Sequence, residues 1–343
     1  MNGHATATVL PCVLALAEQT GASGASALRA FIAGVEAACR VGEILGPGAL
    51  AKPFHPTPIA GALGAAAAGA ILLQLDDAQF ASALGLAATQ AAGLADAVGT
   101  MCKPLHAGTA AAAGTLAARL AARGFTAPAG ALDEGSGFVI GHTAAAEPGA
   151  LAARRGQFLI RQSLMKEHAA CALAIGSIEN MLAIKRSAFF ATGDIQAVRL
   201  QIAASSARVC DIAAPRTGLE MKFSVRTVAA MALLGYDTRR LENFSDDIAS
   251  AADIVELRGR IAVEARDDLD VAMSLATVEL ADGRHLAAAN DERLVDGDVE
   301  RRRARTSAKF RELTAPYLAP ALAAALEKRV FALEASERFD VRP

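Results

Sequence analysis

The sequence predicts a mainly α-helical protein, with a large all-helical domain and a smaller α+β domain. Three observations support this fold class. Hydrophobic residues make up 53% of the 343 residues, and Ala supplies much of that share, which favours closely packed helices. Aromatic residues make up only 4%, which disfavours a β-sandwich. The hydrophobic pattern has a helical period up to about residue 150 and alternates in several runs after about residue 155.

Residues 1–152 are predicted to form the first part of the helical domain. In 25–45 the apolar residues fall on one helical face, and the Gly-Pro-Gly sequence at 46–48 is expected to end that helix. Thr57 is the expected N-cap of the next helix, because a proline follows it in the first turn. The uncharged stretch 57–75 is rich in Ala and Gly and indicates a buried central helix rather than a membrane span.

Small residues and caps predict how this helical part continues. Small residues that recur at spacing four indicate that another helix approaches closely: Gly61, Ala65 and Gly69. Asp76 and Gln79 are predicted to form a capping box for a further helix. A last helix is expected over 107–123, with Gly124 just beyond its end.

An α+β lid domain is predicted over 153–299. Four runs have the pattern of strands, namely 157–165, 195–204, 259–265 and 273–290. Asp282-Gly283 lies between two alternating segments and predicts a hairpin. Helices are expected between the strands, over 170–184 and 225–234. The remaining residues, 300–343, are predicted to form helices that return to the helical domain.

Composition and missing motifs exclude several classes of function. A net charge of −2 argues against a nucleic acid or an anionic membrane as partner, and the basic run at 300–305 is interpreted as a solvated start of a helix. Five cysteines without CxxC spacing argue against disulfides and structural zinc, and they favour the cytoplasm. The start of the chain lacks the basic flank of a signal peptide. Motifs for nucleotides, for zinc hydrolysis and for serine esterases are missing.

The candidate site residues are histidines and lysines in three segments next to predicted helix starts. His55 lies in KPFHPTP, Lys103 and His106 lie in MCKPLHAG, and Lys166 and His168 lie in LMKEHAACA. Helix N-termini attract anions and Lys adds a positive charge, so the three segments together suit a substrate with several carboxylates. Taken singly, such a His is more often a cap or a packed polar group, and such a Lys is usually solvated.

Two sequence segments and their surroundings resemble the MmgE/PrpD family. They are FHPTPIAGALGAAAAGAILLQLDDAQFASALGLAATQAAGL and KPLHAGTAAAAGTLAARLAARGFTAP, and the Lys166 segment, 215–234 and the late hairpin are also similar. The family includes 2-methylcitrate dehydratase of propionate catabolism, cis-aconitate decarboxylase and iminodisuccinate epimerase. The resemblance implies a helical domain with an α+β lid, a homodimer, and a lyase or isomerase without metal or organic cofactor.

The resemblance also assigns roles to individual residues. It implies that His55, Lys103, His106 and Lys166 line a pocket between the domains, with both lysines binding carboxylates of a small di- or tricarboxylate and stabilising negative charge. His4 matches a family histidine associated with proton transfer. His55 or His106 would orient the substrate or move a proton. Lys222, in a KFS motif, is a further candidate for substrate binding, and a structural role there is equally compatible with the sequence.

Three departures from the family pattern leave two classes of function open. A further N-terminal segment with an active-site Asp is expected to be missing ahead of His4. Thr227 stands where relatives often have an aromatic residue, and Cys171 stands where some have His. The first hypothesis is therefore an active dehydratase, decarboxylase or epimerase. The alternative is a truncated, catalytically impaired member that binds a polycarboxylate or pairs with a full-length partner.

Overall fold

The computed structural model describes residues 3–291 and 298–342, apart from the side chain of Leu50. Two compact units are present: 1–97, 101–163 and 314–343 form the first, and 98–100 and 164–313 form the second. The first unit is helical and the second contains the only sheet found in the described ranges, so the predicted fold class is confirmed. The domain boundaries at 152 and 299 stay a prediction, and the compact units change at 163 and 313.

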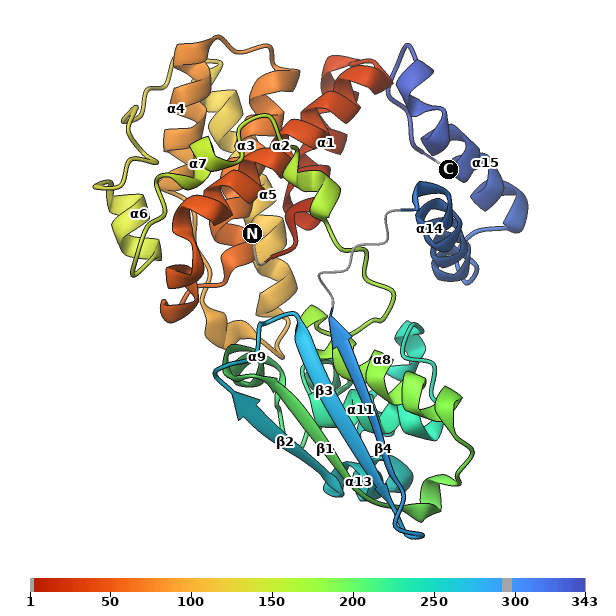
Figure 1. The fold of residues 1–343 in the computed structure, drawn as a ribbon. Coiled ribbons are helices and arrows are strands. Elements are labelled where there is room, and N and C mark those ends of the chain that lie inside the picture. Colours follow the sequence, from red (N-terminus) through yellow and green to blue (C-terminus); the bar gives the residue numbers. More distant parts are fainter. Residues whose placement is uncertain (1–2, 292–297, 343) are drawn as a thin grey trace. The chain divides into compact units, whose positions relative to one another are not determined.

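The first unit is built around one helix, α3 (Pro56–Leu72), that is almost entirely buried (Figure 1). Its elements are α1 (Ala5–Thr20), α2 (Gly24–Leu45), η1 (Pro47–Ala51), α3 (Pro56–Leu72), α4 (Asp77–Ala88), η2 (Ala95–Ala97), α5 (Cys102–Ala121), α6 (Gly137–His142), α7 (Ala150–Ala153), η3 (Leu159–Gln162), α15 (Pro320–Phe331) and η6 (Leu333–Ala335). Helix α3 packs against α1, α2, α4 and α5, and every residue from Thr57 to Leu72 except Ile71 is buried. The predicted buried central helix is confirmed. No helix in the described ranges is long and apolar enough to span a membrane.

Glycines allow the backbones around α3 to approach closely. A Cβ added at Gly61 would lie 2.5 Å from the hydroxyl of Thr8 on α1, and one at Gly69 would lie 2.8 Å from Ala118 on α5. Gly114 of α5 faces α3 in the same way, because its Cβ would lie 2.5 Å from the carbonyl oxygen of Ala62. The close helix approach predicted from these small residues is therefore confirmed. Since α5 carries two of the candidate site residues, this packing also places them relative to the start of α3.

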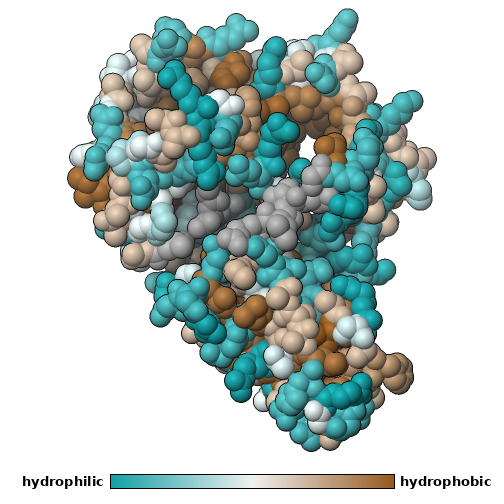
Figure 2. Space-filling view, in the orientation of Figure 1, coloured by the Kyte–Doolittle hydropathy of each residue, from teal (hydrophilic) through white to brown (hydrophobic). Residues whose placement is uncertain are grey.

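The C-terminal segment completes the core of the first unit. Leu333 and Phe339 are buried beside Val9 and other side chains of α1 and α2. Two backbone hydrogen bonds tie this segment to the start of α2, from Gly24 N–H to the Ser336 carbonyl (2.9 Å) and from Phe339 N–H to the Ala22 carbonyl (2.7 Å). On the face drawn in Figure 2, hydrophilic residues predominate, and the buried residues of the described ranges are mostly hydrophobic.

The second unit contains a four-stranded sheet with the order β2-β1-β3-β4. Its elements are α8 (Ala172–Ser187), η4 (Thr192–Asp194), β1 (Ile195–Ala203), α9 (Ala204–Cys210), α10 (Gly218–Met221), α11 (Val225–Leu234), η5 (Leu241–Asn243), α12 (Asp246–Ala249), α13 (Ala252–Gly259), β2 (Ile261–Arg266), β3 (Met273–Leu280), β4 (His285–Asp291) and α14 (Val299–Thr314). Strands β1 and β2 are parallel, in register at Val198 and Ile261, and the other pairs are antiparallel. Helices α8 and α11 pack with the sheet around one apolar core (Figure 1).

Some predicted elements are confirmed and one strand is wrong. The hairpin at Asp282-Gly283 joins β3 and β4, and the capping box of Asp76 and Gln79 starts α4. The run 157–165 contains η3 and irregular backbone instead of a strand. The reason is tertiary: the carboxylate of Glu36 accepts the backbone N–H of Leu159 (2.7 Å) and of Ile160 (3.3 Å), which satisfies donors that a neighbouring strand would otherwise bind.

Candidate functional site

A short antiparallel contact holds His55 at the start of α3. Phe54 pairs with Leu94, and the His55 backbone N–H donates to the carbonyl of Gly93 (2.9 Å). His55 is itself the N-cap of α3, so the N-cap predicted at Thr57 is wrong by two residues. The helix starts earlier because Pro56 suits its first position. The imidazole of His55 makes no capping hydrogen bond, which leaves the ring available for other contacts.

Thr57 holds His4 next to the start of α3. Its hydroxyl oxygen accepts the backbone N–H of His4 (3.1 Å), the residue that precedes α1. The start of α1 therefore lies beside the start of α3. His4 and His55 are close enough that a positive charge on His4 lowers the pKa of His55. Both histidines were predicted in the site from the sequence, but the Thr57 hydroxyl, which binds the backbone of His4, was expected to serve as a cap.

Helix α5 contributes Lys103 and His106. From the sequence they were expected in a turn before a helix at 107, but α5 begins at Cys102, so both lie in its first two turns. The physical reason is that Pro104 falls in the first turn, where no intrahelical N–H is needed. Side chains three positions apart share one face of a helix. Lys103 and His106 are therefore presented together, and both are half-buried.

The rings of His55 and His106 meet directly. Their Nδ1 atoms are 3.3 Å apart, their ring centroids are 5.5 Å apart, and the ring planes are tilted by 46°. Gly93 makes room for this contact: a Cβ there would lie 3.1 Å from Nδ1 of His106, and the backbone φ of +143° also favours glycine. Neither the histidine pair nor the role of Gly93 was predicted, because three distant segments create them.

The surroundings of His55 oppose a positive charge on its ring. Burial is the largest cause that lowers the pKa of His55, followed by the positive charges of Lys103, His106 and His4 in that order, and together they lower it from 6.5 to about 3. His55 is therefore neutral at physiological pH. A region in which one lysine and several imidazoles crowd together, and in which a further cation is disfavoured, is electrostatically suited to an anion.

We expect His55 to remain neutral down to about pH 3, and this predicts an acid-sensitive stability. Between pH 6.5 and 3 the unfolded chain binds a proton at this ring that the folded chain does not bind, so stability falls as the pH falls through this window. His55→Gln should lose less stability than the wild type between pH 7 and 4. Melting temperatures against pH, together with NMR titration of the ring, test this. A wild-type ring that titrates near pH 6.5 would contradict the electrostatic picture.

The second unit carries Lys166 and His168. The backbone carbonyl of Lys166 accepts a hydrogen bond from Nζ of Lys309, and the lysine lies in irregular backbone rather than at the end of a strand. His168 is 4% exposed, and its ring contacts the hydroxyl of Thr238 at Nδ1 (2.7 Å) and the carboxylate of Glu179 at Nε2 (2.8 Å). Both ring nitrogens are therefore engaged within the protein, which supports a structural role for His168.

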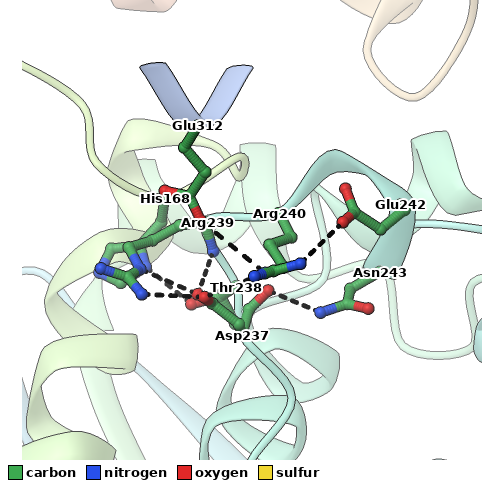
Figure 3. A network of polar contacts seen from close by, with 8 residues as sticks. All are labelled: His168, Asp237, Thr238, Arg239, Arg240, Glu242, Asn243 and Glu312. Atoms are coloured by element: carbon green, nitrogen blue, oxygen red, sulfur yellow. Dashed lines mark hydrogen bonds and ion pairs between the residues drawn. The ribbon is translucent and has the colours of Figure 1, made fainter. Parts of the chain in front are cut away.

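His168 and Thr238 lie beside a network of polar contacts in which Asp237 is the central acceptor (Figure 3). Asp237 accepts hydrogen bonds from the guanidinium of Arg239 (2.9 Å), and its pKa is lowered to about 2 mainly by that contact. Arg240 approaches Glu312 of α14 (3.7 Å), and Arg305 of the same helix pairs with Glu167. No residue of α14 is buried. Charged contacts therefore hold this helix in the second unit.

Replacing His168 by Leu should destabilise the second unit by roughly 1–2 kcal/mol, because the buried Thr238 hydroxyl loses its partner. Urea denaturation measures the free energy of unfolding. In the double variant His168→Leu/Thr238→Val the two substitutions should cost less than the sum of the single ones, since both hydrogen-bonding groups are then removed. Additive costs would show that the contact does not contribute.

Lys222 also belongs to the second unit and ends α10. It is half-buried, burial lowers its pKa, and its Nζ lies 5.5 Å from the centroid of the Phe244 ring. Its backbone carbonyl accepts the N–H of Cys171 (2.8 Å), the N-cap of α8. Thr227 is fully buried and its hydroxyl contacts that of Ser224 (2.8 Å), the N-cap of α11. Thr227 therefore has a structural role at the start of α11.

The structure thus brings His4, His55, Lys103 and His106 together in the first unit. Lys166 and Lys222 lie in the second unit, so their convergence with the first four residues stays a prediction. Among the described residues, no group of three or more His, Cys, Asp or Glu side chains has a geometry suited to a metal ion. Chemically, the first cluster offers one lysine for an anion and imidazoles for proton transfer.

Comparisons with known proteins match both parts of the chain. Residues 1–150 match the MmgE/PrpD N-terminal domain, and residues 168–334 match the MmgE/PrpD C-terminal domain. Similar curated proteins are the cis-aconitate decarboxylase of Homo sapiens, 36% identical over 140 residues, and that of Aspergillus terreus, 38% identical over 141 residues. Each match covers 39% of this chain and 29% of the relative, so the alignment spans less than a third of the relatives' length.

Proposed function

Because the chain belongs to the MmgE/PrpD family, we propose that it is a lyase or isomerase that acts next to a carboxylate of a small di- or tricarboxylic acid. One observation supports this most strongly: Lys103, His4 and His106 surround His55, whose ring is kept neutral. A polycarboxylate would supply the negative charge that suits this cluster. It would also present its reacting carbon to an imidazole.

Proton removal next to a carboxylate, the step that can begin an epimerisation or a dehydration, and loss of carbon dioxide share one electrostatic requirement. Each develops negative charge on the substrate in or near the transition state, and a fixed cation in a partly buried site stabilises that charge. In the proposed mechanism Lys103 binds the carboxylate whose charge grows. A neutral His55 exchanges a proton with the substrate, and His4 is a second proton donor or acceptor.

The second unit is proposed to complete the site. Lys166 and Lys222 would bind the remaining carboxylates in a pocket between the helical domain and the α+β lid, and the protein would act as a homodimer in the cytoplasm. The proposed reaction uses neither a metal nor an organic cofactor. Burial lowers the pKa of Lys222, so an anion beside this lysine would favour its charged form.

The test is turnover of three acids followed by NMR, namely cis-aconitate, 2-methylcitrate and iminodisuccinate. The names of the curated relatives favour decarboxylation of cis-aconitate as the first reaction to assay. The proposal predicts turnover of one acid and its loss in His55→Gln. Binding without turnover by the wild-type chain would favour the alternative of a catalytically impaired member. If the wild-type chain neither binds nor turns over any of the three acids, the proposal is wrong.

A further inference from the structure

The Nδ1 atoms of His55 and His106 face each other, and they form a hydrogen bond only if they share one proton. A neutral imidazole carries a proton on one of its two nitrogens, and a nitrogen–nitrogen contact of 3.3 Å is a hydrogen bond only if one nitrogen donates and the other accepts. If both rings carried their proton on Nε2, two lone pairs would face each other. The neutral pair of His55 and His106 is therefore stable when one ring carries its proton on Nδ1 and the other carries it on Nε2.

The environment of His55 limits how this ring can move a proton. Lys103 and His106 from α5, and His4 from the start of α1, all disfavour a positive charge on it, as does burial. A ring in this environment does not retain a second proton. It transfers a proton efficiently only if it releases one at Nδ1 while it gains one at Nε2. The Nδ1 atom of His106 lies where that released proton would go.

We propose that His106 is a positioning residue that shares a single Nδ1 proton with His55, so that proton exchange between substrate and Nε2 of His55 is coupled to movement of the shared proton. This inference rests on the proposed function. It extends that function by assigning His106 to the second ring of a two-imidazole relay, with no contact to the substrate.

In proton removal, a substrate proton moves to His55 while the shared proton moves to His106. His55 starts with its proton on Nδ1 and a lone pair on Nε2, and His106 starts with its proton on Nε2. The substrate C–H bond breaks, its electron pair stays on the substrate, and the proton binds Nε2 of His55. The Nδ1–H bond of His55 breaks at the same time, and that proton binds Nδ1 of His106. His55 ends neutral and His106 ends as imidazolium, and proton delivery is the reverse.

Two substitutions of His106 separate the hydrogen bond from the relay. His106→Asn places an amide near the former Nδ1 position, so it can still bond to His55 but cannot take up a proton. His106→Phe keeps a ring and removes the bond. His285→Asn, at an exposed position on β4, is the matched control. We expect His106→Asn to lower kcat by about 10²-fold with little change in KM, the usual effect of losing an acid–base partner.

The first readout needs no substrate. Long-range ¹H–¹⁵N spectra of the wild-type protein, with ring assignments from His55→Gln and His106→Asn, report which nitrogen of each ring carries the proton. We expect one of the two rings to carry it on Nδ1. In His106→Phe the ring of His55 should lose its single tautomer, and in His106→Asn it should keep it. Both wild-type rings protonated on Nε2 would overturn the proposal.

The second readout separates a relay from a merely structural contact. Since His106→Asn keeps the hydrogen bond, a kcat of at least half the wild-type value would show that no proton moves to His106, which overturns the relay. Failure of the proposed function looks different. It would appear as a wild-type chain without turnover of any of the three acids, and the ring-nitrogen spectra of that same protein would still decide whether the two rings share a proton.

Discussion

Lys103→Met is expected to lower kcat/KM by roughly 10²–10³-fold, or about 3–4 kcal/mol of transition-state stabilisation, while the protein stays folded. Met keeps most of the stem and removes the positive charge. Lys103 is the largest charged contributor to the low pKa of His55, so its charge acts where the proposed chemistry takes place. Steady-state kinetics on the acid that the wild type turns over measure the loss.

Two further measurements make this prediction specific. The pKa of the His55 ring should rise in Lys103→Met, because one of the charges that lower it is gone. The melting temperature should change little, since the charge removed lies among imidazoles rather than in the apolar core. Lys328→Met, at an exposed position on α15, is the matched control and should leave turnover unchanged. Normal kcat/KM in Lys103→Met would remove this lysine from the mechanism.

Gly114→Ala is expected to destabilise the helical unit by about 2–3 kcal/mol, because the new methyl group has no space. Its Cβ would lie 2.5 Å from the carbonyl oxygen of Ala62 and 2.6 Å from the backbone nitrogen of Ala66, and backbone atoms of a buried helix cannot turn aside. Helices α3 and α5 must therefore separate. The urea midpoint of the helical circular dichroism signal measures the cost.

The same helix provides the control. Gly108 also lies inside α5, but a Cβ there meets nothing within 4 Å, so Gly108→Ala should stabilise by about 0.5–1 kcal/mol through helix propensity alone. Because α5 carries Lys103 and His106, Gly114→Ala should also disturb their position beside His55. Equal stability of the two alanine variants would show that the close contact of α3 and α5 does not constrain the fold.

Short sequence signals predicted the structure correctly where the interacting residues are close together in the chain. The capping box of Asp76 and Gln79 forms both hydrogen bonds, at 2.9 and 3.1 Å, across only three residues. Gly283 adopts a φ of +81° in the turn between β3 and β4, as Asp-Gly predicts. In both cases the interacting groups are neighbours in the chain, so composition and spacing contain the necessary information.

The parts that were wrong or missed depend on distant contacts. Residues 157–165 alternate like a strand, yet a carboxylate 123 residues earlier binds the N–H of Leu159 and no neighbouring strand does. The histidines of the candidate site were found from the sequence, but their pairing was not. His55 and His106 are 51 residues apart, and Gly93, which allows their contact, lies in a third segment. The order of residues along the chain does not show that these three segments meet in the folded protein.

The contribution of the C-terminal segment to the helical core has a consequence for biosynthesis. A ribosome completes α1 to α5 long before it adds Leu333 and Phe339, which fill the core beside Val9. During translation the helical unit is therefore an unfinished intermediate with exposed apolar surface, while the sheet-containing unit can complete its own core as it emerges. Final closure of the helical unit must wait until Leu333 and Phe339 have left the exit tunnel.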